Sequence, residues 1–288
     1  MDMLARSWLC IPALKEGLEE KIIKTSADIV LLDLEDSIPV NKKQVAREKL
    51  LTLNHLIWSK YDVAVRVNAL SRPEGFRDLV FLMDNNIVRK CLVIPKVESP
   101  GELRMLGELQ SVTGGCTKIF AIVETLKGLR GIDAVINDSA NLYGLILGSA
   151  DLSSEISFGL PKSALMQIKC EMALAALSIG LKVIDTPCFN LTCGKLLREE
   201  IEAAKALGYT GKIAVHPSQI SMINRLFSPT QAELEKAKAI IASLASPDLP
   251  TAIASIDGEM VGPPFEVLAR KLLATQELVL NKNNKGAI

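Results

Sequence analysis

Eight short apolar runs, about 20 to 40 residues apart, constrain the fold of this chain more than any other feature of its sequence. Each run is almost continuously apolar, which is the pattern of parallel strands that are covered on both faces. Amphipathic segments such as 43–57 and 197–208 lie between the runs and predict helices. The runs are SWLCIP, DIVLLDLE, VAVRVN, CLVIPKV, KIFAIVE, LYGLILG, LKVIDTP and KIAVHP, ending near Pro12, Glu35, Asn68, Lys96, Glu124, Gly148, Pro187 and Pro217.

Eight strand–helix modules predict an α/β fold, a (β/α)8 TIM barrel, over residues 1–227. A doubly wound open sheet is the alternative, weakened because no GxGxxG follows the first run. Residues 228–288 predict a C-terminal helical extension, whose first helix is expected to have Ser228 as N-cap and Pro229 at its first position. We expect this extension to reach over a barrel mouth, its own or, as we favour, that of a neighbouring subunit in a homo-oligomer.

The composition narrows the classes of function. Lys and Arg (33) balance Asp and Glu (33), which argues against nonspecific nucleic-acid binding. With only His55 and His216, a zinc site or a Ser-His-Asp triad is disfavoured, and a metal held by carboxylates points to magnesium. The cysteines form no CxxC motif, and the chain shows neither a signal-peptide core nor an apolar run of about eighteen residues. We therefore expect a cytoplasmic protein without a membrane partner.

Two carboxylates are the sharpest candidates for chemistry, because the active site of a barrel lies at the C-terminal ends of its strands. Glu124 ends the predicted fifth strand, and Asp151 follows the predicted sixth strand. Because these strands are adjacent, the two side chains can converge. Two carboxylates with water and substrate oxygens suit octahedral Mg²⁺. Helix capping explains them equally well, since Glu124 precedes one predicted helix and Asp151 opens another.

Arg66 lies inside an apolar strand, where a guanidinium can bind a substrate carboxylate through two parallel hydrogen bonds. A salt bridge to Glu35 or Asp33 is an equally good interpretation. Glu35 either orients metal-bound water, as a candidate catalytic residue, or pairs with Arg66. Asp36, before Ser37, is interpreted as a turn former.

Two further residues at the strand ends are candidates for substrate binding. Lys96 is a candidate contact for an anion, and an ion pair with Glu98 is the alternative. His216 is a candidate for the polar lining of the barrel mouth, and a structural hydrogen bond is the alternative.

Taken in order from Arg6 to about Leu273, the strand ends show a family resemblance. The segments that carry it are RSWLCIP, ADIVLLDLEDSIP followed by K…AR, RVN, IPKVES, AIVET, LILGSADLSSEIS, GYTGKIAVHPSQI and FSPTQAELEKA. Together they resemble the citrate lyase β-subunit-like proteins of the HpcH/HpaI aldolase group. Each segment alone is a weak signal, but so many in register are a specific one.

The resemblance implies a magnesium-dependent barrel that makes or breaks a carbon–carbon bond beside an acyl thioester. Its partners would be an acyl-CoA thioester and a 2-oxo acid, and its assembly a trimer or hexamer. Cleavage of citramalyl-CoA to acetyl-CoA and pyruvate is the specific expectation. The alternatives are a citrate lyase β subunit that uses a carrier-protein thioester, a malyl-CoA lyase, and a weakened, non-catalytic barrel that binds acyl-CoA or a 2-oxo acid.

The resemblance also assigns roles to individual residues. It places the metal pair on Glu124 and Asp151 and the carboxylate-binding arginine on Arg66. It makes Lys15 and Lys21 the expected phosphate contacts of coenzyme A, although both could equally be solvated helix charges.

Gly262 departs from the family pattern. In the C-terminal stretch DGEMVGPP, glycine stands where the family carries an aspartate that serves as acid/base at a neighbouring mouth. Because glycine cannot transfer a proton, Glu259, Asp257, Glu35 or water would have to take this role, or the chemistry differs.

Overall fold

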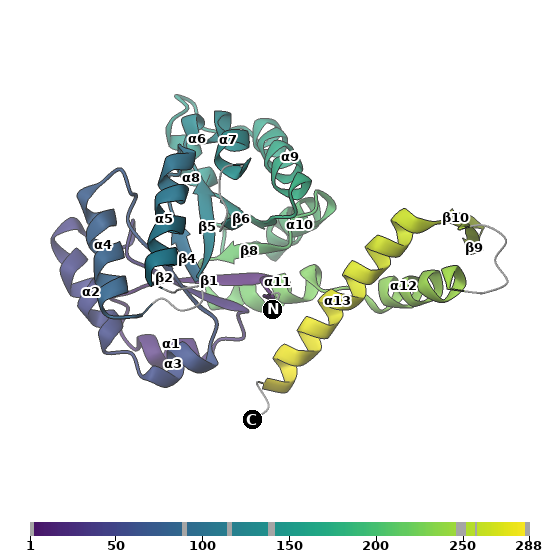
Figure 1. Cartoon of the computed structure of the whole chain (residues 1–288), viewed down its shortest axis with the longest axis horizontal. Coiled ribbons are helices and arrows are strands. Elements are labelled where there is room, and N and C mark those ends of the chain that lie inside the picture. The colour runs from purple at the N-terminus through teal and green to yellow at the C-terminus, as the bar shows by residue number, and fades with distance from the viewer. Residues whose placement is uncertain are drawn as a thin grey trace. The chain divides into compact units, whose positions relative to one another are not determined.

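The computed structural model describes residues 3–87, 91–113, 117–137, 142–245, 252–256 and 258–285. Eight parallel strands close into a barrel in chain order, and helices lie between them (Figure 1). The predicted (β/α)8 barrel is therefore confirmed, with each strand ending within three residues of the expected position. The strands are β1 (Ser7–Pro12), β2 (Ile29–Asp33), β3 (Val63–Arg66), β4 (Cys91–Ile94), β5 (Lys118–Val123), β6 (Leu142–Leu147), β7 (Lys182–Asp185) and β8 (Gly211–Ala214).

Helices follow the strands, and short 3₁₀ turns precede two of them. The expected helix over 43–57 is divided in two, because the Asn54 side chain accepts the Leu56 N–H and caps a new helix. The expected helix over 197–208 ends at a glycine as predicted, since Gly208 has a φ of +92°. The elements are α1 (Leu18–Lys24), η1 (Val40–Lys42), α2 (Lys43–Leu51), α3 (His55–Lys60), α4 (Pro73–Asp84), α5 (Pro100–Thr113), α6 (Leu126–Arg130), α7 (Ile132–Asn137), α8 (Ser149–Ser154), α9 (Lys162–Ser178), α10 (Gly194–Ala206), η2 (Pro217–Gln219) and α11 (Ile220–Phe227).

The barrel interior is closed by large side chains. Trp8 on β1 and Phe120 on β5 are both fully buried, and their rings meet edge to face with centroids 4.7 Å apart. Because β1 and β5 are not neighbours in the barrel, this contact crosses its interior. The polar residues at the strand ends therefore stand above a packed apolar floor.

An ion-pair network holds β7 and β8 to the helices outside them. Lys212 of β8 is fully buried, and its Nζ lies 2.7 Å from Asp185 of β7 and 3.0 Å from Glu200 of α10. Lys169 of α9 approaches the other Asp185 oxygen at 2.7 Å. Two lysines thus balance two carboxylates, as buried charges require.

The chain divides into two compact units, one of residues 5–224 and one of residues 1–4 with 225–288. The second unit contains α12 (Gln231–Leu244), α13 (Pro263–Lys285) and an antiparallel pair that the sequence did not predict, β9 (Ala254–Ile256) and β10 (Glu259–Val261). Its buried core includes Ala237, Ile240, Val261 and Ala269.

The expected N-cap of the first helix in the second unit is wrong. Thr230, two residues after Ser228, caps α12. Its hydroxyl accepts the Glu233 N–H at 3.2 Å, and the Glu233 carboxylate accepts the Thr230 N–H at 2.6 Å. This reciprocal capping box satisfies two backbone donors at once, which a lone Ser228 cap would not do.

Within the described residues, no helix is both long and apolar enough to span a bilayer. The five cysteines in these residues are all free thiols, which agrees with the absence of a disulfide pattern in the sequence.

Candidate active site

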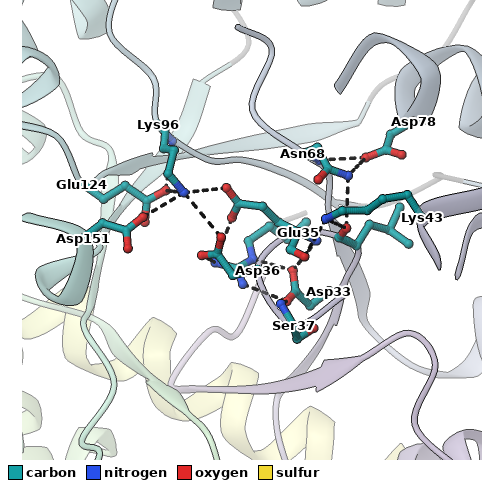
Figure 2. Close-up of polar contacts among 12 residues, drawn as sticks. Asp33, Glu35, Asp36, Ser37, Lys43, Asn68, Asp78, Lys96, Glu124 and Asp151 are labelled. Atoms are coloured by element: carbon teal, nitrogen blue, oxygen red, sulfur yellow. Dashed lines mark hydrogen bonds and ion pairs between the residues drawn. The ribbon is translucent and has the colours of Figure 1, made fainter. Parts of the chain in front are cut away.

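Charged side chains from five consecutive strands and the loops after them meet at one mouth of the barrel (Figure 2). We call this set the mouth cluster, and all of it lies in the barrel unit. Figure 2 shows the Lys96 side chain between two groups of carboxylates, one on each side. The mouth cluster comprises Asp33, Glu35, Asp36, Arg66, Lys96, Glu124 and Asp151.

Arg66 is fixed by a two-pronged salt bridge. Its Nε and one terminal nitrogen donate to the two oxygens of Asp33 at 2.7 and 2.8 Å, and Asp33 is fully buried. Burial works against the charged guanidinium, but its hydrogen bond to Asp33 outweighs this and holds the pKa of Arg66 well above its usual value. The predicted salt bridge is present. It leaves the other terminal nitrogen, 3.2 Å from Glu35, as the donor turned toward the rest of the cluster.

Glu35 connects the two cations of the cluster. One of its oxygens accepts from Lys96 Nζ at 2.7 Å, while the other lies 3.2 Å from Arg66 and has no hydrogen-bond partner among the described residues. The residue is only 5% exposed, and burial raises its pKa more than Arg66 and Lys96 lower it. A buried carboxylate with one oxygen unused can accept a hydrogen bond or a proton from a ligand.

Lys96 contacts both sides of the mouth. Its ammonium lies 2.8 Å from Asp151 and 3.8 Å from Glu124, in addition to the contact with Glu35. Burial lowers the pKa of Lys96, but hydrogen bonds to Asp151 and Glu35 raise it by more than burial lowers it. The pKa of Lys96 therefore lies above its usual value. The alternative ion pair with Glu98 is wrong, because Glu98 pairs with Lys127 at 2.9 Å.

Glu124 and Asp151 face the same ammonium from neighbouring strand ends. The capping interpretation is wrong for Glu124, because Thr125 caps α6. Asp151 does lie in the first turn of α8, as that interpretation expects, but it makes no cap hydrogen bond. Burial, and then the negative charge of Glu35, raise the pKa of Glu124 to about 8 in spite of Lys96. This buried carboxyl is therefore short of positive charge.

Gly148, which precedes α8, makes room for Glu124. A Cβ at Gly148 would lie 2.4 Å from both the Cβ and one carboxylate oxygen of Glu124. Real Cβ atoms do not approach other atoms so closely, so the absence of a side chain at Gly148 lets the Glu124 carboxylate occupy its position.

The charge balance of the mouth cluster fits a divalent cation. Five carboxylates face the side-chain charges of Arg66 and Lys96, and Lys43 adds one positive charge near Asp33, Glu35 and Asp36, so the negative charges outnumber the positive ones. The described residues contain no group of three or more His, Cys, Asp or Glu side chains placed to hold a metal. Glu124 and Asp151 could therefore supply two oxygens, and the remaining ligands of a hard cation would be water or substrate oxygens.

Three predicted contacts lie apart from this cluster. Lys15 is exposed in the turn after β1, and Lys21 is exposed on α1. His216 is exposed and caps η2, with its Nδ1 accepting the Ser218 N–H at 3.2 Å. Among the described contacts, none of the three bonds to the mouth cluster. The structural interpretation of His216 describes its position, and the ligand roles of all three stay predictions.

Asp33 has a larger role in the site than the sequence predicted. It entered only as an alternative partner for Arg66, yet it is the residue that anchors the guanidinium. Asp33 also accepts the Glu35 N–H at 2.9 Å and the Ser37 N–H at 3.1 Å, so it shapes the turn that was assigned to Asp36. The signal was available, because Asp33 and Arg66 end adjacent strands in register and so share a face.

A cavity of about 580 Å³ adjoins the cluster and is lined in part by Glu35 and Lys96. Arg72 and Arg77 also line it, at the start of α4, with Lys43 near the barrel. The Lys43 ammonium donates to the carbonyls of Leu34 and Glu35 at 2.8 and 2.7 Å and so fixes the loop after β2. The cavity can hold a small organic acid beside the cluster.

Several known proteins are similar in sequence to this chain over most of its length. The β subunit of citrate lyase from Haemophilus influenzae is 29% identical, covering 94% of this chain and 96% of that protein. Human mitochondrial citramalyl-CoA lyase is 29% identical over 83% of this chain and 75% of its own length. The (3S)-malyl-CoA thioesterase of Cereibacter sphaeroides is 31% identical over 95% of both chains.

The fold has solved counterparts. The citrate lyase β subunit from Mycobacterium tuberculosis, complexed with oxaloacetate and magnesium, matches with a TM-score of 0.66 and 25% identity, covering 78% of this chain and 98% of that one.

Two family profiles match the chain. One, described as a C–C bond lyase of the TIM-barrel fold, covers residues 176–273, and the other, described as HpcH/HpaI aldolase/citrate lyase, covers residues 6–217. The prediction of a carbon–carbon lyase is confirmed at the level of the family, since both profiles describe aldolases or lyases. Because the second profile spans most of the chain, the protein belongs to the HpcH/HpaI aldolase/citrate lyase family.

Proposed function

We propose that this protein is a magnesium-dependent lyase that cleaves a 3-hydroxy dicarboxylyl thioester into an acetyl thioester and a 2-oxo acid. The observation that carries the proposal is the convergence of Glu124 and Asp151 in the mouth that also holds Arg66. Oxygen ligands are those that Mg²⁺ prefers, and the related M. tuberculosis structure contains magnesium with a 2-oxo acid, oxaloacetate.

The best candidate substrate is citramalyl-CoA, which would give acetyl-CoA and pyruvate. The human citramalyl-CoA lyase supports this choice, and the citrate lyase β subunits support a citryl thioester as the alternative. Hydrolysis of a malyl thioester is a second candidate activity, favoured by the 31% identical thioesterase. In each case the substrate has a thioester, a hydroxyl group and a carboxylate to place in the mouth.

In cleavage, the bond between the α-carbon of the thioester and the hydroxyl-bearing carbon breaks. The hydroxyl loses its proton and becomes the keto group, and the α-carbon takes the electron pair and then a proton. Bound magnesium would act as a Lewis acid toward the substrate oxygens. The terminal nitrogen of Arg66 that faces Glu35 would bind the carboxylate of the 2-oxo acid and fix its orientation. The unused oxygen of Glu35 is available to accept the hydroxyl proton.

The test runs the reaction in the direction of condensation. Purified protein is mixed with acetyl-CoA, Mg²⁺ and one of pyruvate, glyoxylate or oxaloacetate, and mass spectrometry follows acyl-CoA products while a thiol reagent follows free coenzyme A. We expect citramalyl-CoA from pyruvate, and no product after chelation of the metal. Free coenzyme A without a carbon–carbon product would favour the thioesterase, and unchanged acetyl-CoA with every acceptor would refute the lyase proposal for these substrates.

Replacement of Glu124 by Gln tests the site within the same assay. The amide keeps the shape of the side chain but removes the negative charge that a cation needs, so we expect Mg²⁺ binding measured by calorimetry to fall by at least about tenfold, together with activity. Glu98→Gln is the matched control, because this glutamate lies in the loop after β4 but pairs with Lys127 outside the cluster. Unchanged Mg²⁺ affinity in Glu124→Gln would show that the metal site is wrongly assigned.

A further inference from the structure

The position of the Lys96 ammonium suggests a role for this residue that the reaction itself does not assign. The ammonium lies 2.8 Å from Asp151 and 3.8 Å from Glu124, the two carboxylates expected to hold magnesium. On its other side it lies 2.7 Å from Glu35 and 3.7 Å from Asp36 (Figure 2). One positive charge therefore neutralises parts of both carboxylate groups.

The backbone at Lys96 is built around this position. Its φ is +53°, in the left-handed region that residues with a side chain rarely adopt. In this conformation the Lys96 N–H donates to Glu124 at 3.0 Å, so the backbone and the side chain of Lys96 both contact carboxylates of the mouth cluster. Strained residues persist only where the surroundings hold them in place, and here the Glu124 contact does so.

An ammonium and a magnesium ion cannot share the position between Glu124 and Asp151. Mg²⁺ binds oxygen at about 2.1 Å, well inside the distance at which the Lys96 nitrogen now contacts the same carboxylates. Both ions are positive, so each disfavours the other, and burial of the neighbouring groups weakens solvent screening.

We propose that Lys96 is the resident cation of the metal-free site, a positioning residue that holds Glu124 and Asp151 together until Mg²⁺ displaces its ammonium toward Glu35 and Asp36. This inference rests on the proposed function, because it assumes the magnesium site. The receiving carboxylates are already in place: Glu35 accepts from Lys96 at 2.7 Å, and Asp36 is more than half exposed, so it can reorient. The move requires only rotation about side-chain bonds of a flexible lysine.

The proposal predicts the sign of a change in metal affinity. Lys96→Met keeps the length and the apolar stem of the side chain but removes the competing charge. We expect calorimetry to show that Lys96→Met binds Mg²⁺ at least about fivefold more tightly than the native protein. Lys127→Met is the matched control, since it removes one positive charge at an exposed neighbour of the mouth, and its affinity should stay within about twofold of native. If the native protein binds Mg²⁺ and Lys96→Met binds it no more tightly, the proposal is overturned.

Thermal unfolding without metal gives a second readout that does not depend on magnesium. Lys96→Met should unfold at a lower temperature than Lys127→Met, because the carboxylates of the mouth lose their shared counter-ion. Added Mg²⁺ should then raise the unfolding temperature of Lys96→Met more than that of the native protein.

These two readouts separate the inference from the proposed function. If neither the native protein nor Lys96→Met binds Mg²⁺, the magnesium-dependent function fails, whereas a lower metal-free unfolding temperature in Lys96→Met still supports its role as counter-ion. If the native protein binds Mg²⁺ through Glu124 but Lys96→Met is as stable without metal as Lys127→Met, the function stands and the role of Lys96 is refuted.

Discussion

Arg66 illustrates how a single residue serves two purposes in this site. Two of its three nitrogens are committed to Asp33, which fixes the plane of the guanidinium, and only the third faces Glu35. A guanidinium held so firmly loses little freedom when a carboxylate binds. The salt bridge and the substrate-binding role, which compete as interpretations of the sequence, are therefore compatible.

The Asp33–Arg66 pair predicts a dependence of stability on pH. Burial raises the pKa of Asp33, but its hydrogen bond to Arg66 lowers it more, so the folded pKa is below the unfolded value. The stabilisation is thus complete above the unfolded pKa of about 4 and is lost as the pH falls through the folded pKa. Asp33→Asn should cost roughly 3–5 kcal/mol of unfolding free energy at pH 7, because it leaves Arg66 without its buried partner.

Denaturant unfolding at several pH values checks this. The difference between the native protein and Asp33→Asn should shrink below about pH 4, as protonation of Asp33 weakens the native pair as well. Asp36→Asn is the control, since Asp36 is largely exposed and 3.9 Å from Arg66, and it should show little difference at any pH. A difference for Asp33→Asn that stays constant down to pH 2 would contradict the ionic explanation.

At the scale of elements, β6 and α8 position the candidate metal site through a glycine. Gly148 joins the two, and its missing side chain is the space that Glu124 fills from β5. The backbone N–H of Gly148 also donates to the Val123 carbonyl at 3.0 Å, which ties the ends of β5 and β6 together. The two carboxylates are thus brought together by strand pairing and by the absence of one methyl group.

Gly148→Ala should therefore weaken magnesium binding without changing any ligand. The new Cβ would displace the Glu124 carboxylate, and we expect Mg²⁺ affinity to fall by at least about tenfold, since Mg²⁺ demands near-ideal geometry. Gly101→Ala is the control, because a Cβ there meets no atom closer than 3.8 Å. Calorimetry on both variants decides the matter, and native affinity in Gly148→Ala would show that Glu124 is not a ligand.

The elements also show what the sequence could and could not reveal. Near-continuous apolar runs such as KIFAIVE predicted the barrel strands, because burial on both faces leaves a strong local pattern. The Thr230 cap was missed because Ser228 and Thr230 are both suitable capping residues, and the β9–β10 pair was missed because each strand has only three residues. In the site, strand ends predicted that Glu124 and Asp151 converge. The alternative partner considered for Lys96, Glu98, is wrong, because ion-pair partners depend on loop paths, which have no sequence period.

For the whole molecule, the division into two units bears on the proton route. Every residue of the mouth cluster belongs to residues 5–224, whereas Gly262, where the family resemblance expects an aspartate, belongs to the second unit. Asp257, another candidate for this role, lies outside the described residues, and Glu259 is exposed and paired with Lys236. Within the barrel unit, Glu35 is the candidate proton acceptor.

Gly262→Asp tests whether the second unit can supply that group. The backbone does not require glycine there, because a Cβ would meet the Ala252 carbonyl at 3.4 Å, and the residue directly precedes α13, where aspartate is a favourable cap. If an aspartate at 262 restores an acid/base, the condensation rate should rise by about tenfold or more. Gly262→Asn is the matched control, since it has the same shape but transfers no proton. Equal rates in both variants would leave the proton route with the barrel's own residues.

The left-handed backbone at Lys96 also has a consequence for thermal stability. Glycine or asparagine would occupy that conformation at a cost lower by roughly 1 kcal/mol. Selection for thermal stability alone, with magnesium present, would therefore favour replacement of this lysine. Such a protein would unfold at a higher temperature, but it would lose the positive charge that holds the carboxylates of the mouth cluster together without metal. Lys96 is therefore a position at which thermal stability and preparation of the metal site favour different residues.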